Sequence, residues 1–379
     1  NKSYLPVMKK IFLILIFVSS SIYTQIAPEW TINYPLSSIN SIKLVLRDPL
    51  HNLYILSHSN VDSNNISGGF LLLAKTDPSG TLLWKRFYSR PSLDSGDYPV
   101  SMVLDNQNNI YILDASHGYT SGTDLGVVKY NQNGNFLWDY FYTSWGGINS
   151  YDSPHAICID SQNNCFITGK LHSFYYNTDS LVVLKLNSAG TFQWINRYAP
   201  IRTWGNSGEC IKSDDQSNIY VGGSVNDTSS GFINAVILKY NTLGVLQWDR
   251  TYVSPGNNAD CFFDFNFDSQ GNLIASGAAD GIWDYDTSSA LIQKYTSSGN
   301  LIWTQIYHTL NPGGEIAKQI LMDNNDNIFI MGQTSLYSEY PYNSFLLKYN
   351  FAGNLLWSKR YGDLINSKTF VFNIAFDNN

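Results

Sequence analysis

The chain alternates short apolar runs with short polar turns along most of its length. The apolar runs are rich in β-branched and aromatic residues and are bounded by Asn, Asp, Gly or Ser, as at residues 110–113 and 219–222. Runs of this kind are typical of β-strands. A helical interpretation fails because Gly or Asn interrupts every apolar run within about eight residues. The pattern therefore predicts an all-β protein.

The strands recur with a fixed period that is marked by tryptophan. Seven tryptophans are separated by 54, 54, 56, 54, 55 and 54 residues, and a tyrosine follows each of them four positions later. These residues are Trp30, Trp84, Trp138, Trp194, Trp248, Trp303 and Trp357. Residues i and i+4 of a strand point to the same face, so each Trp–Tyr pair is expected to pack against a neighbouring sheet. Self-similarity at this period indicates a repeat architecture.

Each repeat contains two short turns with a constant composition. An aspartate closes the first apolar run and an asparagine lies four residues later, as at Asp105 and Asn109. A lysine closes the third run and a glycine lies five residues later, as at Lys239 and Gly244. Asp and Asn favour Asx turns, and glycine accepts a positive φ. The unit is thus four antiparallel strands in about 54 residues, which is the blade of a β-propeller.

The two ends of the chain supply pieces of one more blade. Residues 28–34 have the pattern of an isolated fourth strand, and residues 371–377 have that of an isolated first strand. We therefore expect a seven-bladed β-propeller over residues 26–379, with six complete blades and a last blade that is incomplete in this chain. Pairing of the two ends would close the ring and remove exposed sheet edges.

The repeat phrases at residues 238–248 and 214–223 resemble the bacterial seven-bladed β-propeller repeat family. That family occurs in secreted and surface proteins, many of them from Bacteroidetes-like bacteria. The resemblance covers nearly everything after residue 27 and implies the architecture, but a fold does not imply a function. Four repeats carry the family's usual glycine after the second strand, whereas Ser57 and Asp114 stand near that place in the first two. We expect a different local geometry there.

The N-terminal segment has the pattern of a signal peptide. Met8 and two lysines precede the apolar residues 11–18, which are followed by three serines. This order is that of a secretory signal, and the apolar run is too short to span a bilayer. We assign residues 8–25 to a signal peptide and residues 1–7 to an upstream extension that is not translated. The protein is expected to be secreted or displayed at the cell surface as a monomeric propeller.

The charge of the chain limits the classes of partner that we expect, and its cysteine content limits the number of disulfides. Charged residues make up 14% of the chain and the net charge is −7, which disfavours nucleic acid and anionic membranes as partners. The four cysteines are few for a disulfide scaffold. Cys158 and Cys165 flank one turn and lie on paired strands. A disulfide could join them, but we favour buried free thiols, since cysteine often serves as a small core residue.

The variable loops are the expected binding surface. Both constant turns fall on one face of the propeller, and the loops of the other face differ in length and sequence in every copy. Function generally lies in loops on a rigid scaffold. The aromatic candidates for ligand binding on this face are Trp145, Tyr175, Trp204, Trp283 and Tyr340. Aromatic rings among short polar side chains suit glycan or protein recognition, although the rings could also pack down on the blades.

A second set of candidates lies eight residues before each turn aspartate. It contains the acidic residues Asp97, Asp152, Asp260 and Glu315, with Asn40, Asn206 and Thr369 in the other copies. These residues would surround one mouth of the central channel. They could form a funnel for cations or polar ligands, but Asx-type turns at the start of each inner strand are the simpler interpretation. His155, in an inner strand, could face the channel, but satisfied burial is favoured for a lone histidine.

No catalytic motif, metal-ligand spacing or cofactor signature is apparent in the sequence. We therefore expect a binding or scaffold module for a glycan or a protein, with no cofactor. The alternative is a propeller enzyme. It would act on a polysaccharide as a hydrolase or lyase, with paired carboxylates among the channel-mouth acids, or as a quinoprotein-like oxidoreductase. A third interpretation is a surface-layer or adhesin segment.

Overall fold

The computed structural model describes most of the repeat region. The described residues are 39–62, 64, 67–90, 96–118, 122–144, 150–173, 175–201, 203–226, 231–256, 258–281, 288–309, 314–335 and 342–361. The expected signal peptide and the expected strands at residues 28–34 and 371–377 lie outside them. The described part contains strands and turns only, so it holds no helix that could cross a membrane. The all-β prediction is confirmed for these residues.

The described strands form six sheets, each built on four antiparallel strands in chain order, and the second sheet has a fifth strand. The first sheet contains β1 (Ile39–Arg47), β2 (Leu53–Val61), β3 (Ser67–Thr76) and β4 (Leu82–Tyr88). The second contains β5 (Asp97–Leu104), β6 (Ile110–Gly118), β7 (Gly122–Tyr130) and β8 (Phe136–Tyr142), and the short β9 (Ser150–Tyr151) pairs with β7 in parallel. The third contains β10 (Ser153–Ile159), β11 (Cys165–Ser173), β12 (Thr178–Leu186) and β13 (Phe192–Tyr198). The fourth contains β14 (Ser207–Ser213), β15 (Ile219–Asn226), β16 (Ile233–Tyr240) and β17 (Leu246–Tyr252). The fifth contains β18 (Cys261–Phe267), β19 (Leu273–Ala279), β20 (Ser289–Tyr295) and β21 (Leu301–Tyr307). The sixth contains β22 (Glu315–Met322), β23 (Ile328–Ser335), β24 (Tyr342–Tyr349) and β25 (Leu355–Tyr361).

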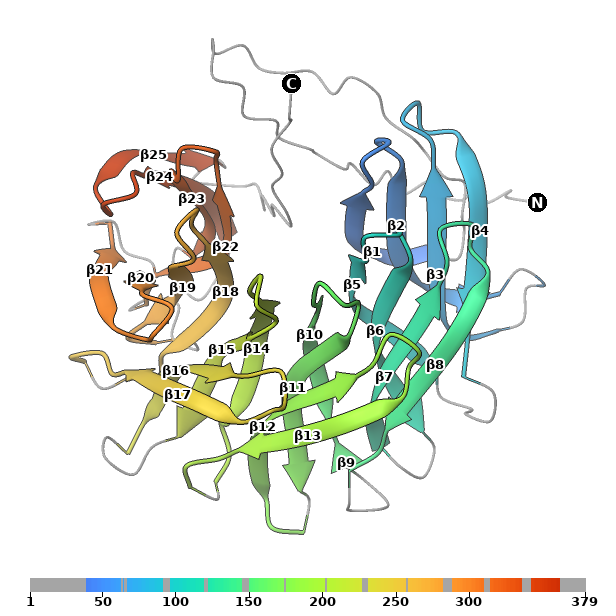
Figure 1. The fold of residues 1–379 in the computed structure, drawn as a ribbon, viewed down its shortest axis with the longest axis horizontal. Coiled ribbons are helices and arrows are strands. Elements are labelled where there is room, and N and C mark those ends of the chain that lie inside the picture. The colour runs from blue at the N-terminus through green and yellow to red at the C-terminus, as the bar shows by residue number, and fades with distance from the viewer. Residues whose placement is uncertain are drawn as a thin grey trace, which may run out of the picture.

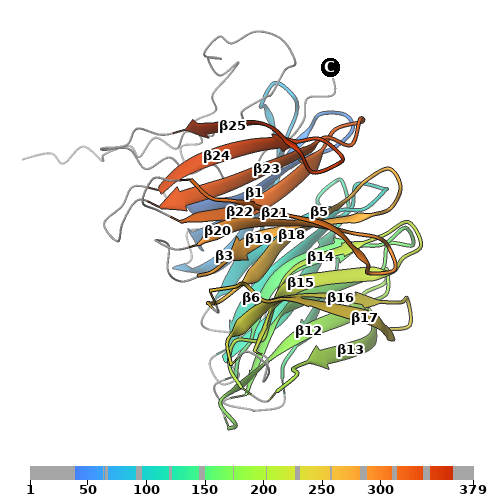
Figure 2. The ribbon, with the colours of Figure 1, turned by 90° about the vertical axis from the view of Figure 1, so that its left-hand side faces the viewer.

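The six sheets follow one another around a central space (Figure 1). The first strand of each sheet lies nearest the centre and the fourth strand lies on the outside. Figure 2 shows the fourth, fifth and sixth sheets stacked face to face. This is the arrangement of a β-propeller. We call the space between the innermost strands the central channel, the end with the Asp–Asn and Lys–Gly turns the short-turn face, and the opposite end the variable face.

The repeat tryptophans pack between adjacent sheets, as expected. Trp194 and Tyr198 of the third sheet lie against buried residues of the fourth, such as Val221. A Cβ atom added to Gly244, in the next sheet's turn, would lie 2.9 Å from the Trp194 ring. The Tyr198 hydroxyl donates a hydrogen bond to Asp249 at 2.7 Å, also in the next sheet. The periodic aromatic pairs therefore join one blade to the next.

The Asp–Asn turns close in the expected way. In the third sheet, Asp160 Oδ1 accepts hydrogen bonds from the backbone amides of Gln162 and Asn164, both at 2.9 Å. Asn164 Nδ2 donates to Asp160 Oδ2 at 2.8 Å. Asn163 has a φ of 62°, and five corresponding residues in the other sheets also have a positive φ. The turn prediction is confirmed.

The repeat lysines have a role that the sequence did not reveal. Lys75 Nζ donates to the Tyr54 hydroxyl at 2.7 Å and lies 3.3 Å from Asp48 Oδ2. Lys129 makes the same contacts with Tyr111 at 2.6 Å and Asp105 at 3.8 Å. The lysine thus links the aspartate turn to the second and third strands. The near-constant spacing between turn aspartate and lysine was the available signal.

Cys158 and Cys165 are free, buried thiols. Cys158 pairs in register with Phe166, the residue that follows Cys165. Adjacent strand residues point to opposite faces, so Cys165 lies on the other face of the sheet from Cys158. Each belongs to a different apolar cluster. The free-thiol interpretation is confirmed.

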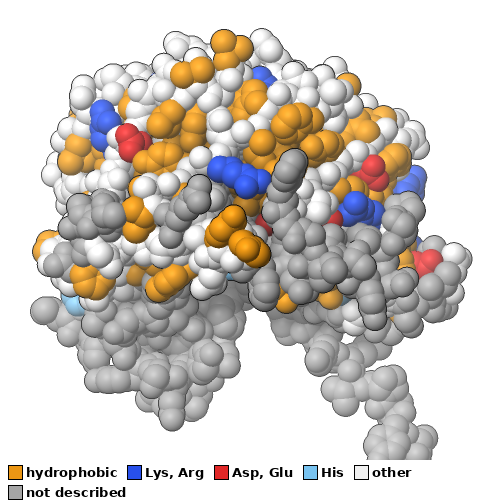
Figure 3. Space-filling model, turned by 90° about the horizontal axis from the view of Figure 1, so that it is seen from below, with side chains coloured by type: hydrophobic (Ala, Val, Ile, Leu, Met, Phe, Trp, Pro, Cys, Tyr) orange, Lys and Arg blue, Asp and Glu red, His pale blue; other side chains and the backbone are white. Residues whose placement is uncertain are grey.

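The outermost strands expose apolar side chains at the positions that follow each turn glycine. Seen from below, the rim of the ring carries many hydrophobic side chains and few charged ones (Figure 3). Leu83 is 52% exposed, Leu301 is 53% exposed and Leu356 is 51% exposed. We therefore expect a functional site with charged side chains inside the ring or at one of its two faces, and not on the outer rim.

Candidate functional site

Each of the six described innermost strands has a β-bulge at the same position of the repeat. In β10, the pairing passes from Pro154–Gly169 to Ala156–Thr168 and leaves out His155. A bulge redirects the side chain of the extra residue and is common beside active sites. The residues at this position are Lys43, Val100, His155, Glu209, Phe263 and Lys318. Each lies three residues after the acidic or amide position that the sequence singled out.

The bulges of the third and fourth sheets bring His155 and Glu209 together. His155 Nδ1 lies 3.1 Å from Glu209 Oε1 and 3.0 Å from the carbonyl oxygen of Gly208. Both oxygens are acceptors, so the neutral imidazole carries its proton on Nδ1. Nε2 is then free to accept a proton, and the Ser153 hydroxyl lies 3.1 Å from it. Both side chains of the pair are 26% exposed. This is the arrangement of an accessible general base held by a carboxylate.

The charges around this pair shift its protonation. Burial by itself would lower the pKa of His155, but the hydrogen bond and charge of Glu209 outweigh burial and raise it. Burial would raise the pKa of Glu209, but His155, the Ser207 hydroxyl and Lys318 together lower it. The Ser207 hydroxyl donates to Glu209 Oε1 at 2.7 Å. Glu209 is therefore held as a carboxylate beside the imidazole.

Lys318 is the bulge residue of the sixth sheet and carries a positive charge. Its Nζ lies 3.7 Å from the centre of the Phe263 ring. Burial lowers the pKa of Lys318, and Cys261 and Glu209 oppose that shift. A partly desolvated ammonium attracts anions more strongly than one in water.

The acidic residues predicted to surround the channel mouth are buried, and their oxygens anchor loops. Asp152 accepts hydrogen bonds from the backbone amides of Ser144 at 3.3 Å and His172 at 3.1 Å. Asp260 accepts them from the amides of Ser254 and Asp280, both at 2.8 Å. Each acid thus ties the incoming connection to the end of its own second strand. These bonds span 6 to 20 residues, so they are not those of the Asx-type turns that the sequence favoured, and the burial of the acids argues against an open funnel.

The other two predicted acids serve in a related way. Asp97 accepts from the amide of Arg90 and from the Ser116 hydroxyl, both at 2.7 Å. Glu315 is fully buried and pairs with Arg360 at 2.7 Å and with His308 at 3.1 Å. No three His, Cys, Asp or Glu side chains in the described part of the chain are grouped so that they could hold a metal ion.

Desolvation leaves two of these acids with unusual pKa values. Burial raises the pKa of Asp152 to about 6, although the amides of Ser144 and His172 oppose the shift. Burial likewise raises the pKa of Asp260 to about 6, against the amides of Asp280 and Ser254. Because both groups are buried among loops, these shifts bear on stability rather than on substrate chemistry.

Two of the five predicted aromatic ligand residues lie in the described part. Tyr175 is 86% exposed and makes an edge-to-face contact with Tyr176, with ring centres 4.9 Å apart. Trp204 is 57% exposed. Its connection is held in place, since the amide of Gly205 donates to Asp179 Oδ2 at 3.0 Å. Both aromatics lie on loops of the variable face. Trp145, Trp283 and Tyr340 lie outside the described residues.

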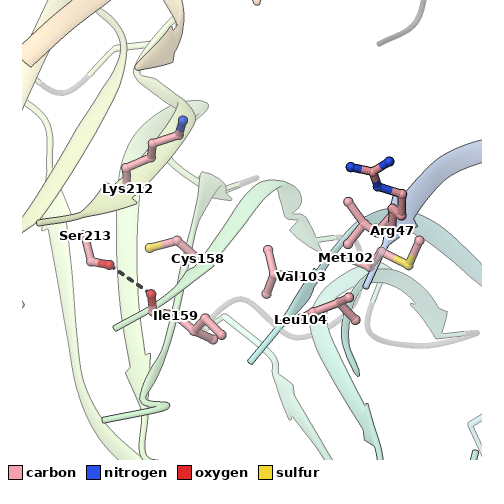
Figure 4. Close-up of a pocket in the computed structure, with 9 residues that line it drawn as sticks. Arg47, Met102, Val103, Leu104, Cys158, Ile159, Lys212 and Ser213 are labelled. Carbon is pink, nitrogen blue, oxygen red and sulfur yellow. Dashed lines mark hydrogen bonds between the residues drawn. The ribbon is translucent and has the colours of Figure 1, made fainter. Parts of the chain in front are cut away.

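A pocket of about 420 Å³ opens between the innermost strands toward the short-turn face. Its floor is apolar and includes Met102 and Cys158, and its two cations are Arg47 and Lys212 (Figure 4). The charge of Lys212 opposes the rise that burial gives to the pKa of Asp264. The channel therefore carries cations at both ends, with His155, Glu209 and Lys318 nearer the variable face.

Sequence reasoning missed Ser153, Glu209, Phe263 and Lys318. It identified His155 as a residue that could face the channel but favoured satisfied burial, whereas the imidazole is partly exposed. The available signal was a constant offset, because each bulge residue follows the acidic or amide position by three.

No family model and no curated protein sequence matches the chain. Among solved structures, a polysaccharide lyase of family PL25, an ulvan lyase, aligns with a TM-score of 0.52 and 11% identity over 83% of this chain and 79% of its own. A PL25 ulvan lyase bound to -[GlcA(1-4)Rha3S]- aligns with a TM-score of 0.50 and 9% identity over 86% of both chains. An α-L-arabinofuranosidase from Fusarium graminearum aligns with a TM-score of 0.46 and 10% identity over 80% of this chain and 91% of its own. The likeness to the lyases is one of fold.

Proposed function

We propose that this propeller binds a polysaccharide at the variable-face end of its central channel and acts on it through His155. The observation that carries the proposal is the geometry of the His155–Glu209 pair. The His155 side chain is 26% exposed, its Nδ1 is fixed by two acceptors, and Nε2, 3.1 Å from the Ser153 hydroxyl, is the nitrogen left to accept a proton. The shared fold with ulvan lyases, which act on a polysaccharide, supports the choice of substrate.

The roles of the two residues follow from their contacts. His155 Nε2 removes a proton during the reaction, and Glu209 keeps the imidazole in the required tautomer and stabilises the imidazolium that forms. The bulges supply the placement, since the residue left out of the ladder is free to reach across to the next blade. Tyr175 and Trp204 offer exposed rings against which sugar faces can pack.

The test is degradation of a polysaccharide panel by the full chain, with new chain ends as the readout. His155→Gln should lower the rate about 100-fold or more while glycan binding remains. His51→Asn is the matched control, because His51 lies in an exposed turn of the short-turn face with a φ of 64° that Asn accepts readily. Equal activity in His155→Gln and in the unaltered protein would refute the assignment.

A binding module without catalysis is the second candidate. The strong exposure of Tyr175 and Trp204 favours it. If the protein binds a glycan or a protein ligand but no substrate in the panel is degraded, this candidate stands. Tyr175→Ala and Trp204→Ala should then each weaken binding, and unchanged affinity in both would remove the aromatic site. Trp145, Trp283 and Tyr340 stay predicted members of that site.

We also propose that residues 28–34 and 371–377 belong to a seventh sheet that completes the ring. The support is the repeat itself, because five repeat tryptophans from Trp84 to Trp303 pack on a glycine of the following sheet. Trp357 would need such a glycine in a further sheet. Residues 371–377 would be the innermost strand of that sheet, and innermost strands of adjacent sheets contact one another, as β18 and β22 do, so cysteine pairs placed across residues 371–377 and β22 should cross-link in the folded protein. Absence of cross-linking at every register would argue against closure.

Secretion is a further proposal, supported by the signal-peptide pattern of residues 8–25. Expression of the full reading frame in a bacterial host should yield a mature protein outside the cytoplasm that has lost these residues. N-terminal sequencing of the exported protein checks the boundary. An uncleaved cytoplasmic product would contradict it.

A further inference from the structure

The surroundings of His155 are more basic than the protein as a whole. The chain has a net charge of −7. However, Lys170 faces Ser153 in the β10–β11 ladder, and Lys318 holds in the sixth sheet the bulge position that His155 and Glu209 hold in the third and fourth. The charge of Lys170 acts to lower the pKa of His155, and that of Lys318 acts to lower the pKa of Glu209. Lys170 and Lys318 are thus two cations set against one carboxylate, Glu209, in this part of the channel wall.

A local excess of cations in a narrow channel favours anionic ligands. Low-dielectric walls strengthen the field, and an acidic exterior does not cancel it over short distances. Farther along the channel, Arg47 and Lys212 continue the basic lining at the short-turn end. The cations of the channel lining thus favour a ligand that carries negative charge, although the net charge of the whole protein opposes one.

We propose that the substrate is a uronic-acid polysaccharide, that Lys318 binds the uronate carboxylate, and that the reaction is a β-elimination. This inference rests on the proposed function and adds the substrate class and the reaction type. Such a reaction requires a base and a cation, and His155 and Lys318 hold the same bulge position of the channel wall in the third and sixth sheets.

The elimination balances without a further reactant. His155 Nε2 takes the proton from C5, which is acidic because it is next to the carboxylate. The electron pair of the C5–H bond forms the C4–C5 double bond, and the C4–O bond to the neighbouring sugar breaks. The leaving oxygen takes up a proton returned by the imidazolium or by water. Lys318 stabilises the negative charge that builds up on the carboxylate while C5 loses its proton.

Hydrolysis fits the described residues less well. Glycoside hydrolysis uses two carboxyl groups on either side of the bond. Glu209 is the carboxylate that touches His155, whereas Asp152 and Asp260 are buried and bind backbone amides. A histidine–carboxylate pair beside lysines suits the removal of a proton from carbon.

The experiment compares each uronate polymer with its carboxyl-reduced form. Polygalacturonate, alginate and glucuronan serve as probes, and binding to the full chain is measured by calorimetry. We expect binding of at least one acidic polymer and at least about tenfold weaker binding of its neutral form, as for loss of one charged hydrogen bond. Lys318→Met should reproduce the loss and Lys318→Arg should restore much of the affinity. Lys85→Met removes an exposed cation from an outer strand and serves as the matched control.

The reaction type has its own readout. Elimination yields an unsaturated uronate that absorbs in the ultraviolet, and no oxygen from isotope-labelled water enters the new chain ends. Products with saturated ends and incorporated label would overturn the elimination but leave the proposed function intact. Equal binding of the acidic and reduced polymers would overturn the role of Lys318. Failure to bind any polysaccharide, acidic or neutral, would refute the proposed function itself.

Discussion

The contact between each repeat tryptophan and the glycine of the next blade can be tested with two glycines of equal conformation. Gly134 has a φ of 76° and Gly271 a φ of 75°. A Cβ atom at Gly134 would lie 2.9 Å from the Trp84 ring, whereas a Cβ atom at Gly271 would have no atom within 4 Å. Alanine at either position therefore meets the same backbone strain, but only Gly134→Ala meets the tryptophan.

The expected magnitudes differ for that reason. Left-handed backbone costs alanine about 1–2 kcal/mol, and the loss of glycine's freedom in the unfolded chain returns about 0.4–1 kcal/mol. Gly271→Ala should therefore destabilise the fold by about 1 kcal/mol. Overpacking adds about 1–3 kcal/mol, which brings Gly134→Ala to about 2–4 kcal/mol.

The assay is urea unfolding of both variants, followed by far-ultraviolet circular dichroism. A double-mutant cycle with Trp84→Leu isolates the contact, because removal of the indole should reduce the cost of Gly134→Ala to that of Gly271→Ala. Two results would refute the reasoning. One is equal destabilisation by the two alanine variants, and the other is an unchanged cost of Gly134→Ala beside Leu at position 84.

Three further predictions concern buried groups. Burial raises the pKa of Asp260 to about 6 from 3.8. The favourable contribution of this carboxyl to stability is therefore complete at low pH and is lost as the pH rises through about 6. Urea unfolding should show that the stability advantage over Asp260→Asn shrinks by up to about 3 kcal/mol between about pH 4 and 6. Burial and the charge of Asp97 raise the pKa of Asp114 well above its ordinary value. Asp114→Ala should therefore stabilise the protein at neutral pH by about 1–3 kcal/mol, and a gain that persists well below the ordinary pKa of 3.8, where the carboxyl is protonated in both states, would contradict the explanation. Thiol titration in denaturant should recover all four cysteines, and a disulfide between Cys158 and Cys165 on non-reducing electrophoresis would show the sheet faces to be assigned wrongly.

The sequence alone predicted the repeat period and the chemistry of the short turns. The tryptophan spacing gave the repeat, and the Asp–Asn and Lys–Gly phrases gave the turns, because Asx bonding and positive φ depend on residues close together in the chain. The same-face position of each Trp–Tyr pair follows from the strand period of two. These features needed no knowledge of how the blades meet.

The candidate site was decided by the tertiary structure. His155 and Glu209 are 54 residues apart and meet because neighbouring blades present equivalent positions to each other. A bulge at that position breaks the strict alternation of faces, so a pattern based on alternation cannot show which residue enters the channel. In the sequence, the acids that lie three residues before the bulge positions look equally suited to a functional site. The structure buries them, because the loops between the sheets pack on them and donate backbone amides to them. Strand order and turn type are short-range properties, whereas the identity of the residues that face the channel depends on contacts between sheets.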